Sequence, residues 1–418
     1  MSKSDPNPEF NVWKVRQEFP MLHQTMHGKP FIYFDSAATA HKPRCVIEAM
    51  EQFYREKYAT VHRSLYDFAS QATTQYNAVR KQVKDFLNAP YVEEIIFTRG
   101  TTDGINLVAS SFGKAFVQQG DEIIISEMEH HSNILPWQFL CEERGAHLKV
   151  IPINDKGELL LDVYEKLLTD RTKMVAVAHM SNATGTINPL AEIIKLAHAH
   201  GAKVLIDGAQ AAAHMPIDVH KLGADFYAFS GHKAYGPTGI GVLFGKRALL
   251  EKMPPYQGGG DMVETVTMRS ATFQAPPLKF EAGTPMIGEV IGLGEAITFI
   301  ESIGRERMAA WGKELMEHAT KRLQEIKGLK IIGTADRKGA LISFSIDGVH
   351  PLDIGTLLDI RGIAVRTGQL CAQPLLQRFN LSTMTRISFG VYNTFEEVDH
   401  FINALKEALL LLRPSLSY

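Results

Sequence analysis

Between residues 94 and 244 the chain alternates short apolar runs with segments of helical pattern, and this alternation constrains the fold more than any other feature. The apolar runs are residues 94–98, 122–126, 174–178, 204–206, 226–229 and 239–244. Helical patterns lie between them at 105–117, 133–144 and 189–200, and Gly201 is a typical helix C-terminal residue. Strands that are apolar throughout must be covered on both faces. We therefore predict a large α/β domain built on a mostly parallel sheet covered by helices.

From about residue 300 onward the pattern is different, because long helices separate fewer strands. The elements predicted there are a helix over 306–326, strands over 341–345 and 363–365, and a final helix that follows the capping box of Thr394 and Glu397. This arrangement is typical of a smaller α+β domain. We predict a large domain over residues 29–300 and a small domain made of residues 1–28 and 301–418.

Charge and cysteine content narrow the class of protein. Lys and Arg number 44 against 46 Asp and Glu, a net charge of -2, so there is no basic excess for binding nucleic acid. The longest uninterrupted apolar stretch, 408–412, is too short to span a membrane, and the polar N-terminus has no export-signal pattern. The three cysteines lack CxxC spacing, which disfavours a disulfide scaffold or a cysteine-bound zinc. We expect a cytoplasmic protein that binds neither nucleic acid nor membranes.

Polar residues follow five of the predicted strands, at the sheet edge where open α/β folds bind ligands. These segments are residues 99–104, 127–133, 181–186, 207–210 and 230–233. In the first, Thr101 and Thr102 open a predicted helix, and hydroxyls at a helix N-terminus suit a phosphate. An ordinary threonine N-cap explains the same residues without any ligand.

His130 and His131 stand side by side after the second strand and allow three interpretations. With the neighbouring carboxylates they could bind a metal, although adjacent side chains point apart and H-x-x-x-H spacing is missing. They could be loop residues, one buried and one exposed. Alternatively, the flat ring of His130 could stack on a flat cofactor.

Asp207 and Lys233 lie at the ends of consecutive predicted strands. Taken singly, Asp207 could form a structural salt bridge or hold a protonated ring nitrogen, and Lys233 could bind phosphate or form a Schiff base. Together with a phosphate loop and a stacking imidazole they form the pattern of a pyridoxal 5'-phosphate (PLP) site, because a Schiff-base lysine with an acidic partner for the pyridine nitrogen is typical of that cofactor.

At this point the sequence resembles a known family. The matching stretches are residues 33–38, 61–63, 99–106, 128–133, 207–210, 230–233, 281–285 and 366–368, and the likeness runs from about residue 12 to about 412. They resemble the fold-type I PLP enzymes of aminotransferase class V, and within them the group II (Suf-type) cysteine desulfurases, relatives of selenocysteine lyase. The resemblance implies a seven-stranded sheet in the large domain and a homodimer.

The resemblance also implies a role for each matching residue. Lys233 would hold PLP as a Schiff base, Asp207 the pyridine nitrogen and Gln210 the phenolic oxygen, with His130 stacked on the ring. The other cofactor contacts would come from Thr101, Thr102, Asn182, Ser230 and His232, and from Thr284 of a second subunit. Arg386 would clamp the substrate carboxylate with help from Asn182, and His62 and Arg366 would line the substrate pocket.

Cys371 separates a desulfurase from other PLP enzymes. A lone cysteine is often a small buried apolar residue, and Cys45 and Cys141 fit that description. Cys371 instead lies among Arg, Gly and Gln, where a nearby cation would favour its thiolate. In the family two histidines usually precede this cysteine, whereas here Gln369 and Leu370 stand in their place.

The implied reaction converts L-cysteine to L-alanine and leaves a persulfide on Cys371. Lys233 would remove the Cα proton, His130 would move the thiol proton, and a Suf-type acceptor protein would take the sulfur for iron–sulfur cluster assembly. L-selenocysteine would be a further substrate. Two rivals remain from the residues: another PLP activity, such as an aminotransferase or selenocysteine lyase, and a metallohydrolase using Glu127, His130, His131 and Asp207.

Overall fold

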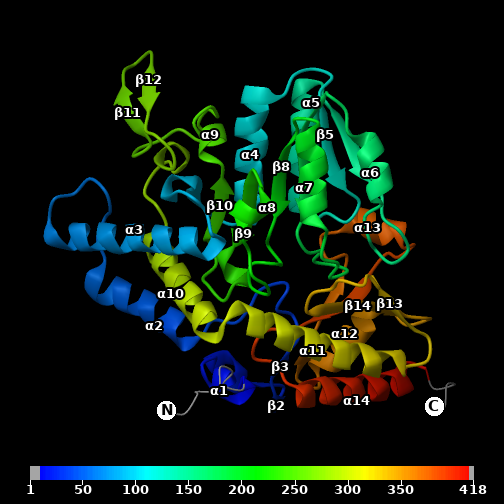
Figure 1. The fold of residues 1–418 in the computed structure, drawn as a ribbon. Coiled ribbons are helices and arrows are strands. Elements are labelled where there is room, and N and C mark those ends of the chain that lie inside the picture. The colour runs from blue at the N-terminus through cyan, green and yellow to red at the C-terminus, as the bar shows by residue number, and fades with distance from the viewer. Residues whose placement is uncertain (1–9, 414–418) are drawn as a thin grey trace, which may run out of the picture.

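The computed structural model describes residues 10–413 (Figure 1). The ends of the predicted small domain, at residues 1–9 and 414–418, lie outside this range. The centre of the molecule is a seven-stranded sheet in the order β4-β10-β9-β8-β7-β5-β6. Its strands are β4 (Ile95–Thr98), β5 (Glu122–Ser126), β6 (His147–Ile151), β7 (Thr172–Ala178), β8 (Lys203–Asp207), β9 (Phe226–Ser230) and β10 (Gly241–Gly245).

Only β10 among these strands runs against its neighbours; it is antiparallel to both β4 and β9, and the remaining pairs are parallel. The prediction of a mostly parallel seven-stranded sheet is confirmed. The carboxyl ends of β4, β5, β7, β8 and β9 consequently meet at one edge, and the ligand segments predicted from the sequence all start there. The sequence pattern missed β6, because it is an edge strand with mostly exposed or half-buried side chains.

Successive side chains of the central strands enter two different cores, which explains why the strands are apolar throughout. In β5, Ile123 and Ile125 pack with α4 and α5, whereas Ile124 belongs to the core on the opposite face. The first face is covered by α4 (Thr101–Phe116), α5 (Leu135–Arg144) and α9 (Arg247–Leu250). The other is covered by α3 (Asp67–Leu87), α6 (Leu161–Leu167), α7 (Leu190–Ala199), α8 (Val219–Leu222) and α10 (Ile287–Ile303).

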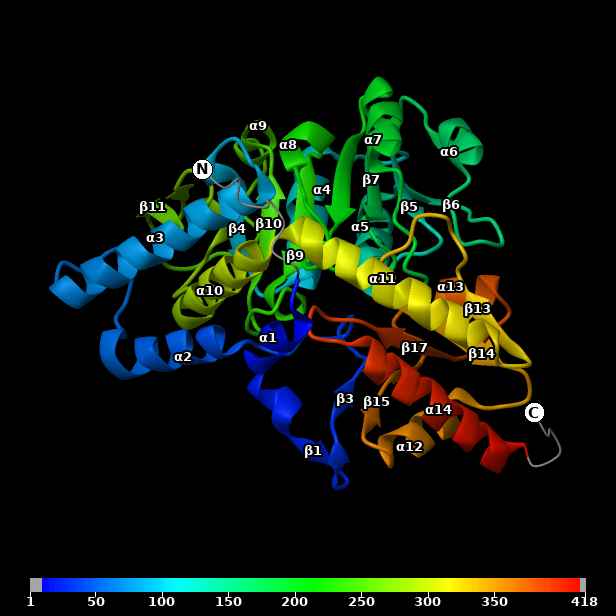
Figure 2. The same ribbon diagram turned by 60° about the horizontal axis from the view of Figure 1, so that its bottom comes forward.

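The C-terminal part forms a second sheet with its own core (Figure 2). Its antiparallel strands, in spatial order, are β13 (Leu329–Ile332), β14 (Leu341–Ile346), β17 (Met384–Ser388) and β16 (Arg366–Gly368). The helices of this part are α11 (Arg305–Gln324), α12 (Pro351–Asp359), α13 (Gln373–Arg378) and α14 (Phe395–Leu412). The predicted capping box is present at the start of α14, where Thr394 and Glu397 bond reciprocally.

The N-terminal segment joins this second sheet. It contains α1 (Val12–Gln17), the small hairpin of β1 (Thr25–Met26) and β2 (Lys29–Pro30), and β3 (Ile32–Tyr33). Strand β3 pairs in parallel with β15 (Ile363–Ala364), and Asp35 forms a bridge with Ser388. The N-terminal contribution to this part therefore extends past residue 28, to at least Asp35; the division into two domains itself stays a prediction.

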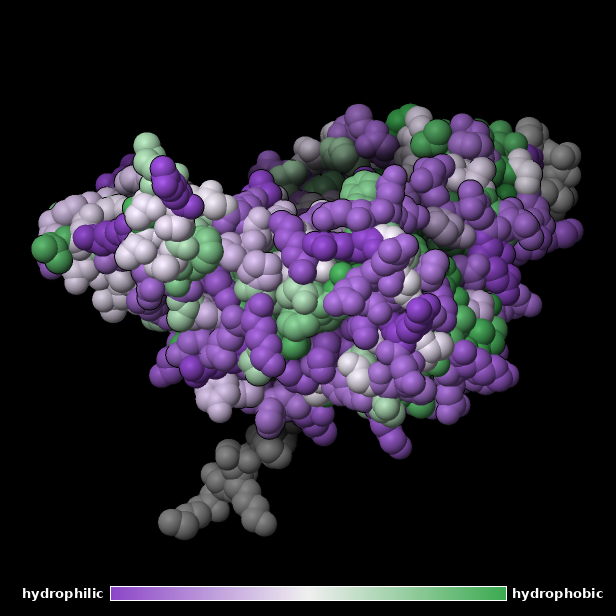
Figure 3. Space-filling view, turned by 90° about the horizontal axis from the view of Figure 1, so that it is seen from above, coloured by the Kyte–Doolittle hydropathy of each residue, from purple (hydrophilic) through white to green (hydrophobic). Residues whose placement is uncertain are grey.

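Two elements protrude from the body beside the large sheet: the outer end of α3, and the hairpin of β11 (Val263–Val266) and β12 (Ala271–Phe273) (Figure 1). Helix α2 (Arg44–Gln52) packs on α10, which in turn packs on α3. Seen from above, the surface is largely hydrophilic, with hydrophobic residues in small patches (Figure 3). Across residues 10–413, no helix has the length and apolar character needed to cross a bilayer.

Candidate active site

A cavity of about 460 Å³ lies at the carboxyl edge of the large sheet, within the range of cofactor sites. It draws side chains from both sheets, although these residues are far apart in the sequence. The predicted site residues that line it are Thr101, Thr102, His130, Asn182, Asp207, Gln210, Ser230, His232, Lys233, Arg366, Cys371 and Arg386.

Hydroxyl groups gather at one corner, where β9 ends and α4 begins. The helix starts at Thr101, so the segment expected as a loop is its first turn, whose N–H groups lack partners within the helix. The Ser230 hydroxyl accepts a hydrogen bond from the Thr101 N–H at 2.8 Å and lies 2.7 Å from the Thr101 hydroxyl. The Thr102 and Ser132 hydroxyls are 2.7 Å apart. This corner combines hydroxyls with the positive end of a helix, as an anion site requires.

His130 is a neutral ring in this site. Burial, with Lys233 nearby, lowers its pKa to about 4. Its Nδ1 accepts a hydrogen bond from the Ser132 N–H at 3.1 Å, so the proton of the neutral ring is on Nε2. A ring in this form can stack on an aromatic cofactor, and it can donate a proton from Nε2.

Asp207 and Lys233 form the polar base of the cavity. Burial raises the pKa of Asp207, which is 6% exposed, and the Ala209 N–H at 2.9 Å and the Lys233 charge oppose that shift. Burial lowers the pKa of Lys233, so the amine is held closer to its neutral, nucleophilic form. Gln210 is fixed by the hydrogen bond that its side-chain amide donates to the Ala37 carbonyl at 2.8 Å.

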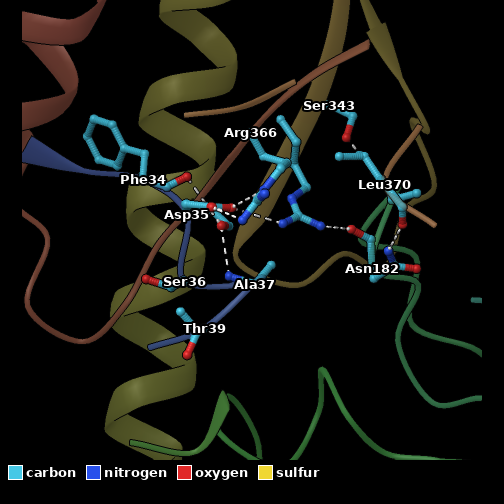
Figure 4. Close-up of polar contacts among 12 residues, drawn as sticks. Phe34, Asp35, Ser36, Ala37, Thr39, Asn182, Ser343, Arg366 and Leu370 are labelled. Atoms are coloured by element: carbon cyan, nitrogen blue, oxygen red, sulfur yellow. Dashed lines mark hydrogen bonds and ion pairs between the residues drawn. The ribbon is translucent and has the colours of Figure 1, made fainter. Parts of the chain in front are cut away.

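Two arginines that line the cavity, Arg366 and Arg386, share the carboxylate of Asp35; Arg366 and Asp35 are labelled in Figure 4. Asp35 accepts from Arg366 Nη2 at 2.5 Å and from Arg386 Nη2 at 3.2 Å. Arg386, 3% exposed, also donates to the Asn182 carbonyl at 2.7 Å, while its buried Nε has no partner. Two guanidinium groups and one carboxylate leave one net positive charge, which matches a single substrate carboxylate.

Asp35 is a site residue that the sequence reasoning did not assign. It belongs to the matching stretch 33–38 and directly follows the apolar residues 31–34. A buried acid is unfavourable without a cation, and this position could therefore have been marked as a partner for a distant arginine.

Cys371 lies on the loop between β16 and α13 and is exposed, whereas Cys141 is buried and Cys45 is half-buried. The loop contacts the large domain at three hydrogen bonds. The His131 N–H donates to the Cys371 carbonyl at 2.8 Å, and the Gln373 N–H donates to His131 Nε2 at 3.2 Å. The Asn182 side-chain amide donates to the Leu370 carbonyl at 2.7 Å (Figure 4). His131, considered in the sequence only as a metal ligand or loop residue, thus touches the cysteine loop.

Two predicted site residues, His62 and Thr284, do not line the cavity of their own chain. The His62 ring packs edge-on against Tyr76, with the ring centres 5.4 Å apart, and lines a separate surface hollow together with Arg80. Thr284 is exposed. The segment around His62 packs on α3, away from the sheet edge, so His62 does not reach this cavity within its own chain, and its place in the substrate pocket stays a prediction.

The residues of the metallohydrolase alternative are not arranged as ligands. Within residues 10–413 no group of three or more His, Cys, Asp or Glu side chains could hold a metal ion. The carboxylate of Glu127 instead accepts from the Ile153 N–H, and His131 faces the cysteine loop.

Comparisons with known proteins agree with the geometry. The model of the family "Aminotransferase class-V" matches residues 32–401. The cysteine desulfurase of Klebsiella pneumoniae is 51% identical over 96% of this chain and 99% of its own length. The solved structure of the cysteine desulfurase CsdA from Escherichia coli has a TM-score of 0.90 and 43% identity, covering 97% of this chain and all of that one. The chain spans 60% of a longer relative, the probable cysteine desulfurase of Mycolicibacterium paratuberculosis, at 48% identity.

Proposed function

The chain belongs to the aminotransferase class-V family, and on that basis we propose that it is a PLP-dependent cysteine desulfurase. One observation carries the proposal: Lys233 and Cys371 line the same cavity, although they come from different sheets. A buried, nucleophilic amine is suited to reactions of amino-acid substrates, and a thiol in the same cavity can take up the substrate sulfur. The names and lengths of the Klebsiella pneumoniae and Escherichia coli relatives support the same activity.

The residues around the cavity fit PLP by their chemistry. Asp207 offers a buried carboxylate to a ring nitrogen, and Ser230 with Thr102 offers hydroxyls to a phosphate at the start of α4. His130 offers a neutral flat ring, and Lys233 an amine that burial keeps nucleophilic. When bound, PLP supplies an electron-withdrawing ring that stabilises negative charge at the substrate Cα.

The protein's own groups then hold the substrate and move its proton. Arg386 binds the carboxylate of L-cysteine through its guanidinium group, whose plane is fixed by Asp35 and the Asn182 carbonyl. Lys233, as a neutral amine, removes the Cα proton and returns it.

Cys371 takes the sulfur. Its thiolate attacks the substrate sulfur, an S–S bond forms as the Cβ–S bond breaks, and the carbon fragment gains a proton to become L-alanine. The balanced reaction is L-cysteine plus the Cys371 thiol giving L-alanine plus the Cys371 persulfide. Because Cys371 is exposed as well as lining the cavity, the persulfide is within reach of an acceptor protein. We propose a Suf-type acceptor that serves iron–sulfur cluster assembly, a cytoplasmic location, and L-selenocysteine as a second substrate.

We propose further that the enzyme is a homodimer in which Thr284 and His62 complete the site of the other subunit. Both lie outside their own cavity, and large apolar side chains nearby are exposed. Leu65 and Met268, on the segment before α3 and at the tip of the β11–β12 hairpin, are fully exposed, and Phe68 is 54% exposed. Apolar side chains gathered on protruding elements mark an interaction surface.

The decisive experiment compares Cys371→Ala with Cys45→Ala, a matched loss of a thiol outside the cavity. With L-cysteine and a reductant, Cys371→Ala should bind PLP normally yet release little sulfide and little L-alanine, whereas Cys45→Ala should resemble the wild type. Full activity of Cys371→Ala would refute a persulfide on this residue. Formation of a keto acid instead of L-alanine by the wild type would identify an aminotransferase.

A further inference from the structure

His131 lies next to the proposed stacking histidine, yet both its backbone N–H and its ring bond to the loop that carries Cys371. Its backbone N–H donates to the Cys371 carbonyl at 2.8 Å, and its ring nitrogen Nε2 accepts from the Gln373 N–H at 3.2 Å. These two hydrogen bonds are made to Cys371 and Gln373, on either side of Ala372. His131 therefore holds both ends of the stretch 371–373. No role in substrate binding accounts for His131, which does not line the cavity.

The held loop has a backbone conformation that it would not favour alone. Leu370 and Cys371 have φ of 55° and 53°, two consecutive residues in the left-handed region. Residues other than glycine are disfavoured in this backbone region, and two such residues in succession add to the conformational cost. Such a conformation persists only where the surroundings fix it.

Two further contacts fix the loop from the same side. The Asn182 amide donates to the Leu370 carbonyl at 2.7 Å, and the Leu370 side chain packs against the main core. This packing gives a reason for an apolar residue directly before Cys371. Gln369, by contrast, is exposed. His131, Asn182 and the core thus hold three of the four consecutive residues 370–373, namely Leu370, Cys371 and Gln373.

We propose that His131 is a positioning residue for the Cys371 thiol, holding the left-handed loop so that the thiol faces the cavity. The inference rests on the proposed desulfurase function. Without the His131 ring, the Gln373 N–H loses its acceptor, and the strained loop relaxes for part of the time. The thiol is then absent from the cavity in that fraction of molecules, while Lys233 and Asp207 are undisturbed.

The test separates two reactions of the same holoenzyme. Persulfide formation from L-cysteine needs both Lys233 and the positioned thiol, whereas exchange of the L-alanine Cα proton with deuterated water needs Lys233 alone. His131→Ala should slow persulfide formation about fivefold, the effect of one lost hydrogen bond, and leave Cα exchange unchanged. Hydrogen–deuterium exchange should become faster in the peptide containing Gln373.

Two variants serve as controls. His131→Gln keeps a side-chain oxygen where Nε2 lies and should recover most of the persulfide rate. His147→Ala removes an exposed histidine on the edge strand β6 and should change neither reaction. Equal loss of both reactions in His131→Ala and His131→Gln would show a general structural defect and overturn the proposal, as would a wild-type persulfide rate in His131→Ala. The proposed desulfurase function is tested separately: it is wrong if Cys371→Ala keeps full activity, whatever the His131 variants show.

Discussion

Replacing Glu281 by glutamine removes the negative partner of a buried arginine, and the geometry of this pair predicts a large loss of stability. Arg80, on α3, donates to the two Glu281 oxygens at 2.6 and 2.8 Å and to the Ile95 carbonyl at 2.8 Å. Both side chains of the pair are 6% exposed, and the guanidinium lies 4.5 Å from the centre of the Phe97 ring. Glu281 also accepts from the Phe97 N–H at 2.7 Å, which joins α3, β4 and the segment leading to Thr284.

The size of the loss in stability follows from the groups that stay buried after Glu281 is replaced by glutamine. Glutamine keeps an oxygen for the Phe97 N–H, so the principal loss is the charge opposite Arg80. Removing one partner of a buried, bidentate ion pair costs about 3–5 kcal/mol, because the other charge stays desolvated and uncompensated. An exposed pair of the same type is worth less than about 1 kcal/mol. Glu51 and Arg55 form such a pair on α2, with side chains 56% and 72% exposed.

Urea denaturation followed by circular dichroism measures both effects. Glu281→Gln should lower the free energy of unfolding by about 4 kcal/mol, and Glu51→Gln by less than about 1 kcal/mol. The double variant Arg80→Met/Glu281→Gln should recover part of the loss, since no unpaired charge then remains buried. If Glu281→Gln and Glu51→Gln have the same small effect, or if the double variant is the sum of its two single variants, the reasoning is refuted.

Three further predictions concern the site and its surroundings. Lys233→Ala should keep the fold but lose steady turnover of L-cysteine and the absorbance of the lysine-linked cofactor; retained turnover would exclude Lys233 as the base. Asp35→Asn should lower the free energy of unfolding by about 3 kcal/mol, because Arg386 is then buried without a counter-charge, and acetate should restore part of it in urea titrations; an absence of acetate rescue would contradict this. Burial lowers the pKa of His179 to about 4, below its unfolded value, so the unfolded state binds more protons between these values and stability falls as pH falls. Going from about pH 7 to about pH 5 should remove about 2 kcal/mol through His179, and His179→Gln should reduce the slope; an unchanged slope would refute the assignment.

The large sheet was predictable because its strands are buried on both faces. Apolar runs such as 122–126 and 174–178 stand out in the sequence for this reason, and the structure places β5 and β7 over them. The edge strand β6 and the long helix α10 were not predicted. In β6 most side chains are exposed or half-buried, and α10 is apolar around most of its surface, so neither shows a clear periodic pattern.

Most of the cavity was also predictable, because parallel strands bring their carboxyl ends to one edge. Asp207 is the last residue of β8 and Lys233 comes shortly after the adjacent strand β9, so their proximity could be predicted without any detail of packing. The place of His62 was not predictable in this way. It lies on a connection before α3, and no sheet register determines which cavity such a segment approaches.

The sequence by itself determined which residues end the strands, because the strands are marked by apolar runs and the polar groups follow them directly. Only the tertiary structure decided which distant groups meet those residues. Asp35 lies between Arg366 and Arg386 because β3 pairs with β15 beside the second sheet, and His131 holds the Cys371 loop because the two sheets face each other across the cavity. The local pattern of apolar and polar residues indicates how each helix or strand is buried, whereas contacts between remote segments depend on how the two cores pack together.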